Sequence, residues 1–159
     1  MRRSVPLLLL LALGTARAES GPLERFAGSW EGMGTYVLHG VYEPCQEFAL
    51  SFASPPGAFV FLRGRRVCDR HQESFAGVRM EARDGVLWYG EQKVGRYDGD
   101  LVQAAFRQPE GDGGWRNWRM SMRREGDRLV YEESRRMDGE ATPMISFAGL
   151  LTLQPAPAQ

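Results

Sequence analysis

The 159-residue chain has few cysteines, few histidines and no excess of charge of either sign. Lysine and arginine total 20, as do aspartate and glutamate, so the formal net charge is zero. A balanced charge argues against a protein that binds phosphate backbones, and we expect no nucleic-acid partner. The two cysteines do not form a CxxC pair, and His39 and His71 stand at no metal-ligating or catalytic spacing. We therefore assign no metal site.

The chain also lacks the short motifs of common enzyme classes. It contains no GxSxG nucleophile, no HExxH zinc motif, no phosphate-binding P-loop and no dinucleotide-binding glycine pattern after a strand. The favoured interpretation is a non-catalytic protein, and we assign no catalytic residue. An enzyme that uses carboxylates such as Glu91 and Glu133 as bases stays open, because burial in a cavity raises a carboxyl pKa.

Long apolar runs are absent except for one near the N-terminus. Two arginines precede an apolar stretch over residues 5–13, and Ala16-Arg17-Ala18 forms a small-x-small cleavage pattern. The apolar run is only about half of the ~20 residues that a membrane-spanning helix needs. The pattern predicts a signal peptide over residues 1–18, a folded domain over residues 19–159, and a periplasmic or secreted protein without a membrane span.

Glycine and proline are abundant, with 19 and 9 residues, and this composition favours short strands joined by tight turns. Strand-like runs alternate with turn signals about every ten residues, and no helix-period segment of useful length appears. The expected strands cover residues 29–39, 45–52, 58–68, 72–82, 86–97, 100–107, 115–124, 128–137 and 141–153.

Short links between all these strands indicate one all-β architecture. Successive hairpins make sequence neighbours antiparallel neighbours in space, and a ring of such strands has no exposed edge. We expect a single antiparallel up-and-down β-barrel of about nine or ten strands. A two-sheet sandwich is the alternative, although sandwiches favour Greek-key crossovers.

The Gly126-Asp127 turn fixes the register of one hairpin. It places Met122 opposite Tyr131, Met120 opposite Glu133, and Trp118 opposite Arg135. The resulting face is mostly apolar and is expected to point into the barrel. Glu133 and Arg135 are its charged members, and they must pair, bind a ligand or contact water, because an unpaired buried charge costs several kcal/mol.

Two further turns extend the same interior face. Asp98-Gly99 is expected to pair Glu91 with Phe106, and Asp84-Gly85 is expected to pair Met80 with Tyr89. Aromatic and methionine walls with a few polar groups are typical of a cavity for an amphipathic molecule. The candidate ligand-binding residues are Trp30, Tyr89, Glu91, Trp118, Met120, Met122, Tyr131, Glu133 and Arg135.

Arginines also gather over residues 63–70, and the last turn leaves a question of register. Arg63, Arg65, Arg66 and Arg70 stand among acidic residues, and we interpret them as a solvated, salt-bridged surface, with a site for an anionic partner as the alternative. The Asp138-Gly139 turn would send Ile145 and Phe147 outward unless the chain bulges near Pro143. The register of the last strand is therefore open.

The two cysteines are predicted to form a disulfide. If the Pro55-Pro56 loop places Phe52 opposite Phe61, the same register places Cys45 opposite Cys68. An exported protein with two cysteines usually joins them.

The first expected strand begins with the motif GxWxGxG, formed by Gly28-Ser29-Trp30-Glu31-Gly32-Met33-Gly34. This heptapeptide resembles the opening of nitrobindin-like haem-binding β-barrels, and its GxW core resembles the first-strand motif of lipocalins. The resemblance implies a lipocalin-like barrel in which Trp30 closes one end and Gly32 and Gly34 let the first strand bend. Nitrobindin-like proteins hold haem through a late histidine, and this chain has no histidine after His71.

Together these features predict an exported, non-catalytic, lipocalin-like barrel that binds a small hydrophobic or amphipathic molecule. No cofactor is assigned. The alternatives are a structural or partner-binding envelope protein with a filled barrel, and a haem-binding barrel whose ligand is not histidine. The non-histidine candidates for iron are Met120, Met122, Met137 and Tyr131.

Overall fold

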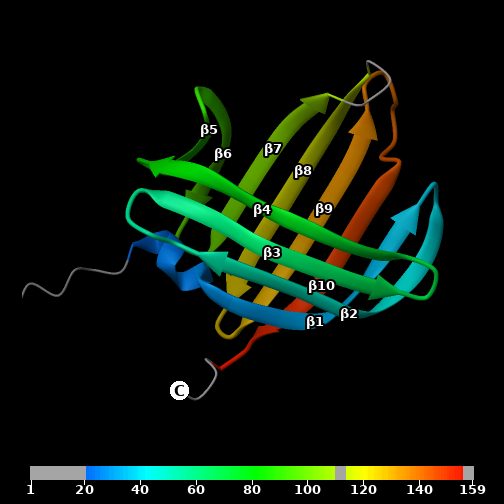
Figure 1. Cartoon of the computed structure of the whole chain (residues 1–159), viewed down its shortest axis with the longest axis horizontal. Helices are drawn as coiled ribbons and strands as arrows, with labels where there is room; N and C mark the ends of the chain where they lie inside the picture. Colours follow the sequence, from blue (N-terminus) through cyan, green and yellow to red (C-terminus); the bar gives the residue numbers. More distant parts are fainter. Residues whose placement is uncertain (1–20, 110–113, 156–159) are drawn as a thin grey trace, which may run out of the picture.

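The computed structural model describes residues 21–109 and 114–155, so the predicted signal peptide lies outside the described residues. The chain forms one short 3₁₀ helix and ten β-strands (Figure 1). The elements are η1 (Pro22–Phe26), β1 (Gly28–Leu38), β2 (Val41–Ala53), β3 (Ala58–Cys68), β4 (Gln72–Arg83), β5 (Val86–Tyr89), β6 (Gln92–Asp98), β7 (Leu101–Pro109), β8 (Trp115–Glu125), β9 (Arg128–Met137) and β10 (Ile145–Leu153).

The strands close into a single antiparallel barrel. Each strand pairs with its neighbours in sequence, and β1 pairs with β10 to complete the ring. The predicted up-and-down barrel is confirmed, and the two-sheet sandwich is excluded. The β8–β9 hairpin has the predicted register, with Met120 opposite Glu133 and Trp118 opposite Arg135.

One predicted strand is wrong. Residues 86–97 form two strands, β5 and β6, because the chain turns at Gly90, which has a φ of +58° that glycine adopts without strain. Glu91 is therefore an exposed turn residue, and the expected pairing of Glu91 with Phe106 does not occur. The next hairpin turns at Gly99-Asp100 and pairs Tyr97 with Val102, so its predicted register was two residues off.

The structure determines the register of the last strand. β10 begins at Ile145, after a connection of several residues, and pairs Phe147 with Glu133. A tight turn at Asp138-Gly139 would have placed Phe147 outside, but the longer connection turns it inward. Phe147 is 2% exposed and belongs to the barrel core.

One end of the barrel is closed by η1 (Figure 1). Leu23 and Phe26 insert into the core, and the Phe26 ring packs edge-on against Phe59 at 6.3 Å. Trp30 is fully buried beneath the helix, and its indole N–H donates to the Phe26 carbonyl at 2.9 Å. The Arg124 guanidinium lies over the Trp30 ring at 5.6 Å. Trp30 thus packs at the closed end, as the heptapeptide resemblance implies.

The β1 glycines lie where the ring closes. The β1–β2 register shifts between Gly32 and Gly34, so the first strand is irregular there. A Cβ atom on Gly32 would lie 2.0 Å from the Leu150 carbonyl oxygen, and one on Gly34 would lie 2.3 Å from the Phe147 ring. Glycine at these positions lets β1 and β10 approach closely enough to pair.

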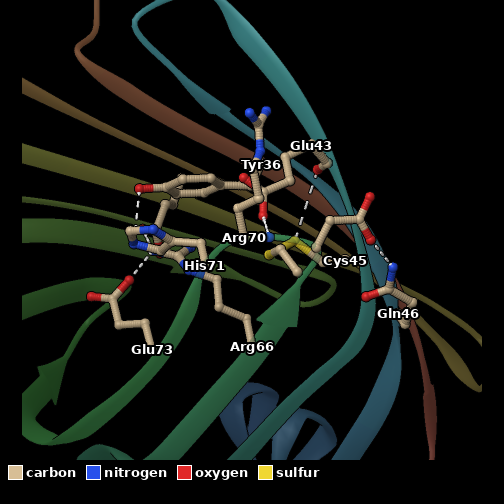
Figure 2. Close-up of a disulfide and its surroundings, with 11 residues drawn as sticks. Tyr36, Glu43, Cys45, Gln46, Arg66, Arg70, His71 and Glu73 are labelled. Carbon is tan, nitrogen blue, oxygen red and sulfur yellow. Dashed lines mark hydrogen bonds and ion pairs between the residues drawn. A yellow bond between two sulfur atoms is a disulfide. The ribbon is translucent and has the colours of Figure 1, made fainter.

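Cys45 and Cys68 form a disulfide, as predicted, and tie β2 to β3 at the end opposite η1 (Figure 2). The same hairpin pairs Phe52 with Phe61, although two register shifts separate this pair from the cysteines. Within residues 21–109 and 114–155, the structure contains no helix with the length and apolarity needed to cross a membrane.

Candidate ligand-binding cavity

The barrel contains a cavity of about 340 Å³. Strands β2 to β9 all contribute lining side chains. The apolar lining consists of Phe52, Phe61, Phe75, Val78, Met80, Tyr89, Phe106, Trp118, Met120 and Tyr131, and the polar lining of Glu73, Gln92, Arg107, Gln108, Arg116, Glu133 and Arg135. The volume lies near the lower end of the range for small-molecule sites.

The polar rim of the cavity lies at the end away from η1. Gln92 begins β6 and Gln108 lies near the end of β7, and these strand ends meet at that end of an antiparallel barrel. Arg107 on the rim pairs with Asp138 at 2.5 Å and lies 4.6 Å over the Trp115 ring. Its charge is therefore compensated within the rim.

Two groups of aromatic rings form the apolar walls. On one side, Phe61 contacts Phe75 with ring centroids 5.8 Å apart. On the other side, Phe106 contacts Trp118 at 5.0 Å and Tyr89 at 5.8 Å. Strands β3 and β8, which carry Phe61 and Trp118, lie five positions apart in the ring of ten in either direction. The two aromatic walls therefore face each other across the lumen.

A closed ring of four ionic side chains lies at the cavity, and three of its members, Glu73, Glu133 and Arg135, line it. Arg66 Nη1 lies 3.3 Å from Glu133 Oε1, and Arg66 Nη2 pairs with Glu73 Oε2. Arg135 Nη1 lies 3.0 Å from Glu73 Oε1, and Arg135 Nη2 lies 3.0 Å from Glu133 Oε1. Each guanidinium thus contacts both carboxylates, and we call this set the ionic ring.

Three aromatic side chains pack against the Arg66 guanidinium of the ionic ring. Arg66 is completely buried, and its guanidinium lies 4.8 Å from the Tyr36 ring, 5.4 Å from Phe75 and 5.3 Å from Phe147. Such cation–π contacts favour a desolvated guanidinium. His71 stacks on Tyr36 at 4.8 Å beside Arg66 and Glu73 (Figure 2).

The Tyr131 hydroxyl completes the hydrogen bonding of the buried carboxylate. It donates to Glu133 Oε2 at 2.7 Å, while Glu133 Oε1 receives both guanidinium groups. Both carboxylate oxygens of Glu133 are therefore engaged within the protein. Glu73 is the more exposed carboxylate of the ring, with 27% of its side chain accessible.

The ionic ring shifts the pKa values of Glu73 and Arg135, and its Glu133 contributes to the shift of the neighbouring Tyr131. Burial opposes ionisation of Glu73, but Arg66 and Arg135 outweigh burial and lower the pKa of Glu73. Burial likewise acts to lower the pKa of Arg135, but Glu133 and Glu73 outweigh it and raise that pKa. Burial and the adjacent Glu133 charge raise the pKa of Tyr131 well above its usual value. At neutral pH, Glu73 and Arg135 are ionised and Tyr131 is a neutral donor.

The structure brings six of the nine sequence-predicted residues to the cavity: Tyr89, Trp118, Met120, Tyr131, Glu133 and Arg135. Trp30 and Met122 are completely buried below it and do not line it. Glu91 lies in the exposed β5–β6 turn, so its expected interior position is wrong. The ligand-binding role of each residue remains a prediction.

Sequence reasoning missed Arg66 and Glu73. The interpretation of Arg66 as part of a solvated surface is wrong, since its side chain is fully buried. Strand alternation carried a signal, because Cys68 faces the interior and Arg66 stands two residues earlier on the same face. Glu73 lies directly opposite Arg66 in the β3–β4 hairpin, so the register of that hairpin carried the signal for it. Its second partner, Arg135, lies on β9 across the lumen and gave no local signal.

No protein-family model matches the chain, and no curated protein has a significantly similar sequence. Among residues 21–109 and 114–155, no group of three or more His, Cys, Asp or Glu side chains is placed to hold a metal ion.

Proposed function

We propose that this protein is an exported, lipocalin-like barrel that binds a small, mainly apolar molecule in its cavity without transforming it. The observation that carries the proposal is the 340 Å³ cavity with aromatic and methionine walls and a few polar groups at one end. Ligand sites commonly combine apolar walls with a few polar groups that orient the ligand. Export is supported by the Cys45–Cys68 disulfide and by the signal-like pattern of residues 1–18.

The cavity favours a small ligand. Its volume corresponds to about eleven water molecules at the density of liquid water. The floor is closed by Trp30 and the residues of η1, so a long chain cannot pass through the barrel. A compact molecule with one or two rings suits this space.

A binding role is better supported than catalysis. The two carboxylates at the cavity are held by guanidinium groups, and the pKa of Glu73 is lowered. A carboxylate with a lowered pKa is a weaker base at neutral pH. Glu73 is therefore not poised to remove a proton from a ligand, and both oxygens of Glu133 are already engaged by Arg66, Arg135 and Tyr131.

The haem alternative does not fit the cavity. Among the described residues that line it there is no histidine and no cysteine. Of the four non-histidine candidates, Met122 and Met137 do not line the cavity, and Tyr131 is engaged with Glu133. Met120 lines it as a buried side chain of the apolar wall, and a lone methionine in such a wall is ordinary packing. We therefore propose no haem-dependent function.

Binding can be tested with N-phenyl-1-naphthylamine, a neutral fluorophore whose emission rises in apolar surroundings. Val78 lines the cavity, and Val130 is a half-buried valine on the outer face of β9. The Val78→Phe variant fills part of the cavity and should weaken fluorophore binding at least about tenfold, whereas Val130→Phe should leave it near the parent value.

Native mass spectrometry of the protein from its own host should detect a bound small molecule that Val78→Phe loses. Equal binding by the parent and by Val78→Phe, with both folded, would place the ligand elsewhere and refute the proposal. If the fluorophore does not bind and native mass spectrometry detects no bound molecule, the alternative of a filled structural barrel is favoured.

A further inference from the structure

The charges of the ionic ring beside the cavity cancel one another within the protein. The ionic ring contains two guanidinium groups and two carboxylates, and each contacts both members of opposite charge. An anionic ligand group that binds Arg135 would weaken the ion pairs that Arg135 makes with Glu73 and with Glu133. A cationic ligand group that binds Glu73 would weaken the ion pairs that Glu73 makes with Arg66 and with Arg135. A charged ligand therefore leaves a charge of the protein poorly compensated, which is costly in a desolvated site.

The ring still has hydrogen-bonding capacity toward the cavity. Arg135 has five N–H donors, and two nitrogens of its guanidinium are directed at Glu73 and Glu133. Glu73 accepts from Arg66 and Arg135, while a carboxylate offers about four acceptor positions. Both side chains line the cavity and are partly accessible. The pair thus presents a donor beside an acceptor.

The apolar walls favour a flat ligand. Phe61 and Phe75 on one side face Phe106 and Trp118 on the other, across a lumen of limited volume. Aromatic rings pack well in offset or edge-on contact with such walls. A flexible alkyl chain of similar size loses more conformational entropy when it is confined.

We propose that the cavity selects a neutral, planar aromatic molecule with an amide-like edge, meaning a hydrogen-bond donor adjacent to an acceptor. The edge contacts Arg135 and Glu73, and the ring system lies between the aromatic walls. This inference rests on the proposed function and specifies its ligand class. It excludes fatty acids, aromatic acids and protonated arylalkylamines as preferred ligands.

A matched set of probes tests the proposal by isothermal titration calorimetry of the exported protein. The set is naphthalene-2-carboxamide, 2-naphthoate, 2-naphthylmethylammonium and decanamide, which differ in charge or in planarity. The carboxamide should bind at least about tenfold more tightly than each of the others, because it alone satisfies the donor, the acceptor and the walls. Each probe should also compete with N-phenyl-1-naphthylamine in proportion to its affinity.

A charge variant separates recognition from a general loss of structure. Glu73→Gln leaves the ionic ring with one excess positive charge, so the ratio of naphthoate to carboxamide affinity should rise about tenfold. Glu132→Gln removes an exposed carboxylate on the outer side of β9 and should leave this ratio unchanged. A ratio between two ligands does not respond to a uniform loss of folded protein.

The outcomes distinguish the two proposals. If naphthoate, the ammonium probe or decanamide binds as well as the carboxamide, the ligand class is wrong while cavity binding stands. If the fluorophore binds at the cavity and no naphthalene probe does, the ligand class is again wrong. If neither the fluorophore nor any probe binds, both proposals fail. An unchanged ratio in Glu73→Gln would refute the role of the ionic ring in selection.

Discussion

Glu73 and Arg135 meet at 3.0 Å although their strands, β4 and β9, lie five positions apart in a ring of ten. Strand β4 crosses in front of β9 in Figure 1, so the two strands belong to opposite sides of the barrel. The ion pair therefore spans the lumen rather than neighbouring strands. It joins the two sides near the polar rim and places charge beside the aromatic cavity.

The pairing of Glu73 predicts a specific loss of stability in acid. Burial opposes its ionisation, but Arg66 and Arg135 outweigh burial and lower its pKa in the folded protein. Folding therefore gains stability above the unfolded carboxyl pKa of about 4.3, and loses it as the pH falls through the lower folded pKa. Urea unfolding at several pH values should show this loss in the parent and a shallower loss in Glu73→Gln. An equally steep loss in the variant would contradict the prediction.

The raised pKa of Tyr131 predicts a loss of folding stability in alkali. Burial, followed by the Glu133 charge, raises its pKa well above the usual value of about 10. Its contribution to stability is present below the unfolded pKa and is lost as the pH rises toward the folded pKa. Absorbance titration near 295 nm should show a tyrosine that ionises only as the protein unfolds, and Tyr131→Phe should remove that step. Ionisation of Tyr131 in the folded protein near pH 10 would refute this prediction.

The hairpins were predictable because their registers are local. A two-residue turn at Gly126-Asp127 leaves one pairing for β8 and β9, and Met120 lies opposite Glu133 as expected. The same logic failed where the turn was misplaced. Gly90 reverses the chain inside a run that otherwise has the composition of one strand, and this moved Glu91 to the surface.

The ionic ring was only half predictable. Glu133 and Arg135 followed from one hairpin, but Arg66 and Glu73 reach them from β3 and β4 across the lumen. Arg66 and Glu73 lie opposite each other in the β3–β4 hairpin, so their own pairing is local. Their contacts with Glu133 and Arg135 depend on how closure of the ring brings the β3–β4 and β8–β9 hairpins together. The approach of the two hairpins across the lumen is not set by the spacing of residues within one turn.

The disulfide predicts a measurable stabilisation at the rim end. Cys45 and Cys68 close a loop with a sequence separation of 23, which corresponds to about 3 kcal/mol in the chain-entropy model. The Cys45→Ser, Cys68→Ser double variant should lose about that much free energy of unfolding in urea. Reductant should destabilise the parent and leave the double variant unaffected. A loss below about 1 kcal/mol would indicate that the disulfide constrains little of the unfolded chain.

The close approach of β1 and β10 predicts that two glycine substitutions differ strongly in their effect on the free energy of unfolding. A Cβ on Gly32 would lie 2.0 Å from the Leu150 carbonyl oxygen, a backbone atom that cannot rotate away. Gly32→Ala should therefore cost about 1–3 kcal/mol or more and expose strand edges that self-associate, detectable by urea unfolding and size-exclusion chromatography. Gly99 has open space around its Cβ position, so Gly99→Ala should stay within about 0.5 kcal/mol of the parent. Equal stability of the two variants would mean that β1 and β10 do not approach closely.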